Sequence, residues 1–149
     1  YFSAHTFYWG DWHRDSVLGL ERGSRISPTA SSLAKGITFT VHNDAPIVPP
    51  DVMRLVWATS NRLTRSGQVL GPDERISVED ALKAVTVNAA YQYFEEDRKG
   101  SIEVGKQADF VLLSANPLNI QREDLLNIKV LQTIARGVTV FSAENALPE

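Results

Sequence analysis

One acidic side chain stands at the end of a predicted β-strand, in the segment between residues 37 and 44. Residues 37–42 are ITFTVH, and β-branched and aromatic residues of this kind favour a strand. Because side chains alternate between the two faces of a strand, the polar residues share one face, and continued alternation puts Asp44 with them. A carboxylate there can bind a divalent metal ion or take a proton from a metal-bound water. A plain turn is the alternative, because Asn43, Asp44 and Pro46 are residue types that turns favour.

A second group of candidate residues lies near the start of the chain, where residues 5–15 are HTFYWGDWHRD. Aromatic side chains with polar tips suit the wall of a substrate pocket. The candidate substrate contacts in this segment are His5, Tyr8, Trp9 and Asp11. In a strand predicted over residues 2–8, the His5 side chain would line the same cavity as Asp44. The alternatives are that His5 is an ordinary hydrogen-bonded histidine and that the aromatic residues pack the loop.

Helices are predicted around these segments from capping residues and apolar spacing. Two short helices are expected, one running from Asp15 to about residue 22 and one that Pro28 begins and Gly36 ends. Longer helices are expected at 52–63, capped by Asp51, and from Ser77 to about residue 90. Strands alternate with helices over the first ~95 residues, which favours parallel βα units.

The last third of the chain has a different pattern. Residues 101–114 are SIEVGKQADFVLLS and predict β-structure around a turn at Gly105 and Lys106. A short helix is expected at 121–126, and two strands hinged near Arg136 and Gly137 are expected over 128–141. The predicted domain boundary therefore divides residues 1–97 from residues 98–149.

Two βα units cannot close a parallel sheet, and a full eight-unit barrel takes roughly 250 residues. We therefore expect these 149 residues to be a portion of a longer protein.

Composition excludes several classes of protein. The chain has no cysteine, which excludes a disulfide-stapled module, a cysteine-based zinc finger and a catalytic thiol. The formal net charge is −3, whereas a nucleic-acid partner requires clustered basic residues, so none is predicted. No membrane partner is predicted either, because no run of about 18 apolar residues occurs. Cytoplasm is the default location.

Several catalytic devices are absent from the sequence. Neither a glycine-rich phosphate loop nor a GxSxG nucleophile turn occurs, which disfavours a flavodoxin-like nucleotide-binding domain and a serine hydrolase. The three histidines, His5, His13 and His42, have neither HxH nor HExxH spacing. A complete metal site is therefore not predicted within this chain.

Two motifs resemble a known superfamily. SVEDALKAVTVNAA at 77–90, followed by GSIEVGKQAD at 100–109 and then FVLLSANP, resembles the C-terminal part of the metal-dependent amidohydrolases. The upstream HTFYWGDWHRD and the HNDAP loop resemble the branch called amidohydrolase family 3, which includes N-substituted formamide deformylase-like enzymes.

The resemblance implies an α/β fold and a hydrolytic function. Residues 1–97 would supply the last two βα units of a (β/α)8 TIM-type barrel, and residues 98–149 would supply strands of a small composite β-sandwich. Asp44 matches the metal-binding, proton-shuttling aspartate of the eighth barrel strand, and His5 with the WGD stretch matches a substrate-side segment. The expected reaction is hydrolysis of a non-peptide amide or formamide C–N bond. The expected cofactor is a divalent metal, zinc, whose other ligands lie outside the chain.

The partners expected from this interpretation are a small amide substrate, the remaining barrel residues and further copies in a homo-oligomer. The alternative is a non-catalytic remnant or scaffold that associates with another chain. The absence of a local HxH pair favours this alternative for the isolated 149 residues, and exposed strand edges would drive the association.

Overall fold

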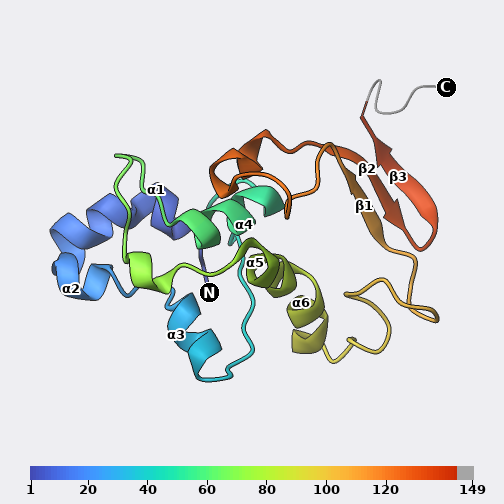
Figure 1. Cartoon of the computed structure of the whole chain (residues 1–149), viewed down its shortest axis with the longest axis horizontal. Coiled ribbons are helices and arrows are strands. Elements are labelled where there is room, and N and C mark those ends of the chain that lie inside the picture. The colour runs from blue at the N-terminus through green and yellow to red at the C-terminus, as the bar shows by residue number, and fades with distance from the viewer. Residues whose placement is uncertain (144–149) are drawn as a thin grey trace.

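The computed structural model describes residues 1–143, so the last six residues of the predicted second domain lie outside the described part. Figure 1 shows a group of helices joined to a small sheet at the other end of the molecule. The helices are α1 (His5–Trp12), α2 (Gly19–Gly23), α3 (Thr29–Ala34), α4 (Val52–Asn61), α5 (Val78–Val85) and α6 (Val87–Gln92). The strands are β1 (Phe110–Leu113), β2 (Val130–Ala135) and β3 (Val138–Ser142). No helix within residues 1–143 combines the length and the hydropathy needed to cross a bilayer.

The strand predicted over residues 2–8 is wrong, because this segment enters helix α1. Thr6 and Gly10, four residues apart, are buried on one face of the helix. Gly10 permits a close approach to the following loop, since an added Cβ would lie 2.9 Å from Thr64 Cγ2. On the same helix, Phe7 packs edge-on against Trp57 of α4 at 5.5 Å between ring centroids. Packing against distant residues therefore overrides the strand-like composition of the segment.

Residues 37–42 are extended but form no β-strand among the described residues, which corrects the second predicted strand. The predicted alternation is present in part, since Phe39 and Val41 are buried whereas His42 is exposed. The Tyr1 amino group donates to the Thr40 carbonyl at 2.7 Å, and the His42 amide donates to the Tyr1 carbonyl at 3.0 Å. One residue bonded to both neighbours of Val41 is the hydrogen-bond pattern of a parallel ladder.

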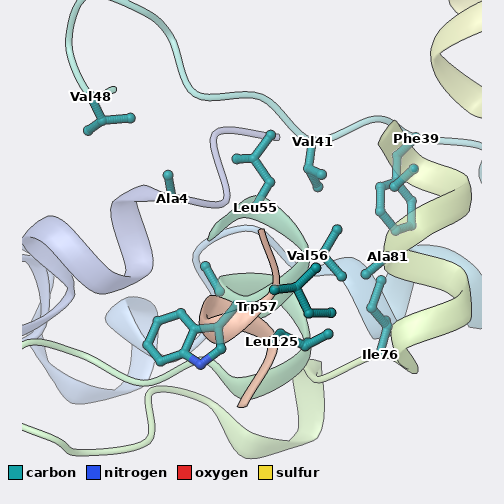
Figure 2. Packing of buried hydrophobic residues seen from close by; sticks show 13 residues of the cluster. Ala4, Phe39, Val41, Val48, Leu55, Val56, Trp57, Ile76, Ala81 and Leu125 are labelled. Atoms are coloured by element: carbon teal, nitrogen blue, oxygen red, sulfur yellow. The ribbon is translucent and has the colours of Figure 1, made fainter. Parts of the chain in front are cut away.

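Helix α4 is confirmed and forms the centre of the core. The Asp51 carboxylate accepts a hydrogen bond from the Arg54 amide at 3.1 Å, which is an N-cap. Figure 2 shows Leu55, Val56 and Trp57 of this helix packed among buried side chains from several other elements. The helix ends at Asn61 because the next residue, Arg62, takes a left-handed conformation with φ 54°.

The helix predicted after Ser77 is confirmed at its start and interrupted near its end. Ser77 Oγ accepts from the Asp80 amide at 3.0 Å and caps α5. At Thr86 the backbone leaves helical geometry, with φ −124° and ψ −95°, so a second short helix, α6, follows. Asn88 of α6 donates to the Phe39 carbonyl at 2.9 Å and holds the extended segment against the helices.

The shorter predicted helices occur with shifted bounds. Residues His13–Val17 form a π-helical turn ahead of α2, and α3 begins after Pro28 rather than at it. The helix predicted at 121–126 is a 3-10 helix over Arg122–Asn127.

The sheet is antiparallel with strand order β1-β2-β3. Arg136 and Gly137 form the hairpin turn predicted from the sequence, with φ 53° and 77°, as a type I′ turn requires. The strand structure predicted around Gly105 is wrong before Phe110, because residues 100–109 form bends, a turn at 104–105 and irregular backbone. Asp109 explains part of this, since its Oδ1 accepts from the Arg136 amide at 2.8 Å and so fastens the turn segment to the hairpin.

Candidate functional site

The three histidines form a cluster in which Phe2 lies against His5 and His42, and His13 lies against His5. The Phe2 ring stacks on His42 at 5.5 Å between centroids and lies 5.4 Å from His5. His13 follows α1 and brings its ring within 5.5 Å of His5. The hydrogen bonds between Tyr1 and residues 40–42 position this cluster, because they hold the first turn of the chain beside the extended segment.

Asp44 follows this cluster in the chain, two residues after His42. Its backbone takes φ 56°, and its carbonyl accepts from the Ile47 amide at 2.8 Å, so the turn considered as an alternative is present. The Asp44 side chain is exposed, and its carboxylate makes no hydrogen bond within the described residues. The turn and the chemical role are therefore compatible, because the turn uses the backbone and leaves the carboxylate available.

His5 is largely buried and neutral at ordinary pH. Its Nε2 lies 3.2 Å from Ser27 Oγ. Burial is the main cause that lowers the pKa of His5 to about 4, and the nearby charges of His13 and Arg62 lower it further. A neutral imidazole has one donor and one acceptor nitrogen, which suits binding of a polar substrate group.

Arg62 is a residue that sequence reasoning missed. The residue is 1 % exposed, and within residues 1–143 its guanidinium donates to main-chain carbonyls and to no side chain. The acceptors are Leu70 at 2.6 Å, Ile26 at 2.8 Å, Ser27 at 3.0 Å and Ser24 at 3.3 Å. Burial lowers the pKa of Arg62 to about 10, which still leaves it charged at neutral pH. No local pattern could have revealed this role, since three of the four acceptors lie at least 35 positions away.

The other predicted substrate contacts are divided between two places. Trp9 joins the histidine cluster, with its ring 5.8 Å from Phe2. Tyr8 lies at the edge of this cluster, since its ring is 5.7 Å from that of Trp9 and Arg65 lies over its face at 5.2 Å. Asp11 is held by the loop after α4, because its carboxylate accepts from the amide and the hydroxyl of Ser66 at 3.0 and 2.7 Å. The structure therefore brings His5 and Trp9 together and leaves Asp11 engaged elsewhere.

A complete metal site does not fit the part of the chain that the structure describes. Within residues 1–143, no group of three His, Cys, Asp or Glu side chains could hold a metal ion. The histidine cluster packs ring against ring, in contacts that belong to aromatic packing rather than to ligands converging on a common point.

A large apolar groove lies elsewhere, between the helices and the sheet. It has a volume of about 1010 Å³, and its lining includes Met53, Leu82, Phe110 and Leu113. Neither His5 nor Asp44 lines this groove, so it is separate from the candidate site.

The sequence profile of the Amidohydrolase family matches residues 2–141. The chain belongs to this family. The match includes the histidine cluster, Asp44, the helices and most of the sheet.

Known amidohydrolases and related proteins are similar over most of this chain. N-substituted formamide deformylase of Arthrobacter pascens is 29% identical over 138 residues, which are 89% of this chain and 24% of that protein. Protein LONG AFTER FAR-RED 3 of Arabidopsis thaliana is 33% identical over 132 residues, 85% of this chain and 22% of its own length. The crystal structure of an amidohydrolase from Thermotoga maritima matches with a TM-score of 0.56 at 31% identity, covering 78% of this chain and 26% of that one. The chain thus spans about a quarter of the length of these relatives.

Proposed function

We propose that the protein containing this chain hydrolyses a non-peptide C–N bond of an amide or formamide, and that residues 1–97 supply the end of its catalytic barrel. Membership of the amidohydrolase family and the similarity to N-substituted formamide deformylase support this proposal. Residues 98–149 contribute strands to a composite β-sandwich in the same proposal, and the protein acts in the cytoplasm.

The observation that carries the proposal is the parallel hydrogen-bond pattern between Tyr1 and the segment around Val41. Residues that follow adjacent parallel segments emerge at the same edge, which is where barrel enzymes keep their reactive groups. The stacking of Phe2 on His42 supports this arrangement, since these residues directly follow the paired positions. It favours a site shared by His5, on the first segment, and Asp44, on the second.

In the proposed mechanism Asp44 accepts a proton from the attacking water and delivers it to the leaving nitrogen. Asp44 would also be one ligand of a divalent ion, zinc in this proposal, whose other ligands would come from residues outside this chain. When bound, such an ion lowers the pKa of a water to about 7. The exposed carboxylate of Asp44 supports this role, because it makes no hydrogen bond within residues 1–143 that would compete.

His5, Tyr8, Trp9 and Asp11 are the proposed substrate contacts. Of these, His5 and Trp9 are best supported, because both rings lie against Phe2. A small N-acyl or N-formyl compound presents an apolar group and a carbonyl, which suit an aromatic wall with one polar nitrogen.

The test is Asp44→Asn in the full-length protein, assayed against a panel of N-alkylformamides and simple N-acyl amides. We expect kcat to fall about 10³-fold, because general acid–base catalysis contributes roughly 10²–10⁴. Asp73→Asn is the matched control, since Asp73 is also an exposed aspartate, in the short 3-10 helix Pro72–Glu74, and it should keep wild-type turnover. Turnover by Asp44→Asn at the wild-type rate, with metal still bound, would contradict the proposal.

A second candidate function is a non-catalytic scaffold that associates with another chain. The exposure of strand β3 favours it, since Val138 and Val140 are 64% and 62% exposed. Elemental analysis and sedimentation of the full-length protein distinguish the two functions. Stoichiometric metal in a hydrolytically active protein supports the enzyme, whereas a tight homo-oligomer without metal or activity supports the scaffold.

A further inference from the structure

Three residues from separate parts of the chain form a continuous line of hydrogen bonds that ends on His5. Arg62 Nη1 donates to the Ser27 carbonyl at 3.0 Å, and Ser27 Oγ lies 3.2 Å from His5 Nε2. Arg62 and Ser27 are 1% and 7% exposed, so solvent competes little for these bonds. The line connects the end of α4 to a ring at the proposed substrate side of the site.

Ser27 has a backbone conformation that serine seldom adopts. Its φ is 46°, in the left-handed region that favours glycine. Such a conformation persists only when the surroundings impose it. Here the Ser27 carbonyl accepts from the Thr29 amide at 2.9 Å as well as from Arg62, so both sides of the carbonyl are held. Glycine would fit this backbone better than serine does. The group that serine has and glycine lacks is the hydroxyl.

We propose that Ser27 is a positioning residue for His5, whose imidazole it fixes with Nε2 turned inward and Nδ1 left for the substrate. The inference rests on the proposed function, because it assumes that His5 contacts the substrate. Within residues 1–143, the contact with Ser27 is the side-chain hydrogen bond that His5 makes.

Fixing the ring matters because the two nitrogens of a neutral imidazole differ. A half-turn of the ring would exchange the positions of its donor and acceptor nitrogens. When the ring is held, Nδ1 presents one defined group to the site, a donor or an acceptor according to which nitrogen carries the proton. Four groups with a charged form lie near His5: His13 after α1, Arg62 after α4, the Tyr1 amino group, and His42 beside Phe2. These groups and burial keep the pKa of His5 low, so the ring that Ser27 holds is the neutral one.

The kinetic test is Ser27→Gly in the full-length protein. Glycine accepts φ 46° without strain, so the variant removes the hydroxyl while the fold is kept. We expect KM to rise about fivefold, which corresponds to one neutral hydrogen bond, while kcat stays within twofold. Arg136→Gly is the matched control, because Arg136 also has a positive φ, of 53°, but sits in the hairpin turn. This control should leave KM and kcat at wild-type values.

A double-mutant cycle on unfolding supplies a readout that needs no activity. Ser27→Gly and His5→Phe are combined, and the unfolding equilibria of the four proteins are compared. We expect a coupling of about fivefold in the unfolding equilibrium constant, and the effect of Ser27→Gly on KM should vanish in the His5→Phe background.

The outcomes separate this inference from the proposed function. If Asp44→Asn is inactive but Ser27→Gly leaves KM unchanged, or if the cycle shows no coupling, the positioning role is wrong. If the coupling is present but Asp44→Asn retains full activity, the proposed function is wrong. The contact between Ser27 and His5 is then structural, and Ser27 has no positioning role in catalysis.

Discussion

The candidate site and the β-hairpin are stabilised by contacts of different range. Around the site, the hydrogen bonds join residues far apart in the sequence, such as Ser27 with Arg62 and Ser27 with His5. In the hairpin, β2 pairs with β3 across a two-residue turn. Long-range contacts allow the site to combine side chains from several elements, whereas the hairpin pairs two strands that are neighbours in the sequence.

The two prominent aspartates of these regions differ in the same way. Asp109 uses its carboxylate to accept from the Arg136 amide at 2.8 Å and also accepts from Gln107. Asp44 makes no such bond within residues 1–143, although its backbone forms a turn. A carboxylate that accepts hydrogen bonds from its own protein stabilises the fold. A carboxylate without such bonds is available to bind a ligand or to transfer a proton.

The largest expected effect on stability comes from Arg62→Met. The variant keeps an apolar stem but leaves four buried carbonyl contacts unmade, so we expect a loss of about 4 kcal/mol in the free energy of unfolding. The midpoint of denaturant unfolding measures it. Arg65→Met is the control, because Arg65 is exposed in the same loop, and its midpoint should stay near wild type. Equal midpoints for the two variants would show that the stability of the site region does not depend on the hydrogen bonds from Arg62 to the main-chain carbonyls.

A pH effect of intermediate size is expected from His5. Its pKa is about 4 in the folded protein and near 6.5 when unfolded, so the unfolded state binds more protons between these values. The free energy of unfolding should therefore fall as pH is lowered from about 6.5 to 4. Denaturant unfolding at several pH values measures the slope, and His5→Phe should flatten it. An unchanged slope in this variant would mean that another group controls acid stability.

The smallest expected effect comes from Asp109→Ala. Because Asp109 is exposed and its carboxylate holds the hairpin turn, we expect a small fall in the midpoint of thermal unfolding, with kcat and KM unchanged. Thermal unfolding together with steady-state kinetics checks both parts. A large loss of kcat in a folded variant would remove the contrast between Asp109 and Asp44.

The local features of the fold were predictable from the sequence. Asp51 and Ser77 cap α4 and α5 as expected, and the turn at Arg136 and Gly137 lies where its residue types predicted. In each case the stabilising groups lie within a few residues of one another.

The first helix was not predictable in this way. Its N-cap, Ala4, makes no side-chain cap, and its aromatic residues are spread around the axis without a clear period. The helix depends on Gly10 lying against Thr64 and Leu70, which are more than fifty residues away. Among the site residues, Asp44 could be named as a candidate from its place after the extended segment, whereas the link from Arg62 through Ser27 to His5 has no local pattern.

The left-handed residue that terminates α4 is also the residue whose guanidinium spans the neighbouring loop. Inserting or deleting one position anywhere in that helix would swing the Arg62 side chain by about 100° around the axis. The guanidinium group would then point away from the loop carbonyls. The length of α4 is thus set by a geometric requirement outside the helix itself, so surface substitutions along it should be tolerated far better than any change in the number of its residues.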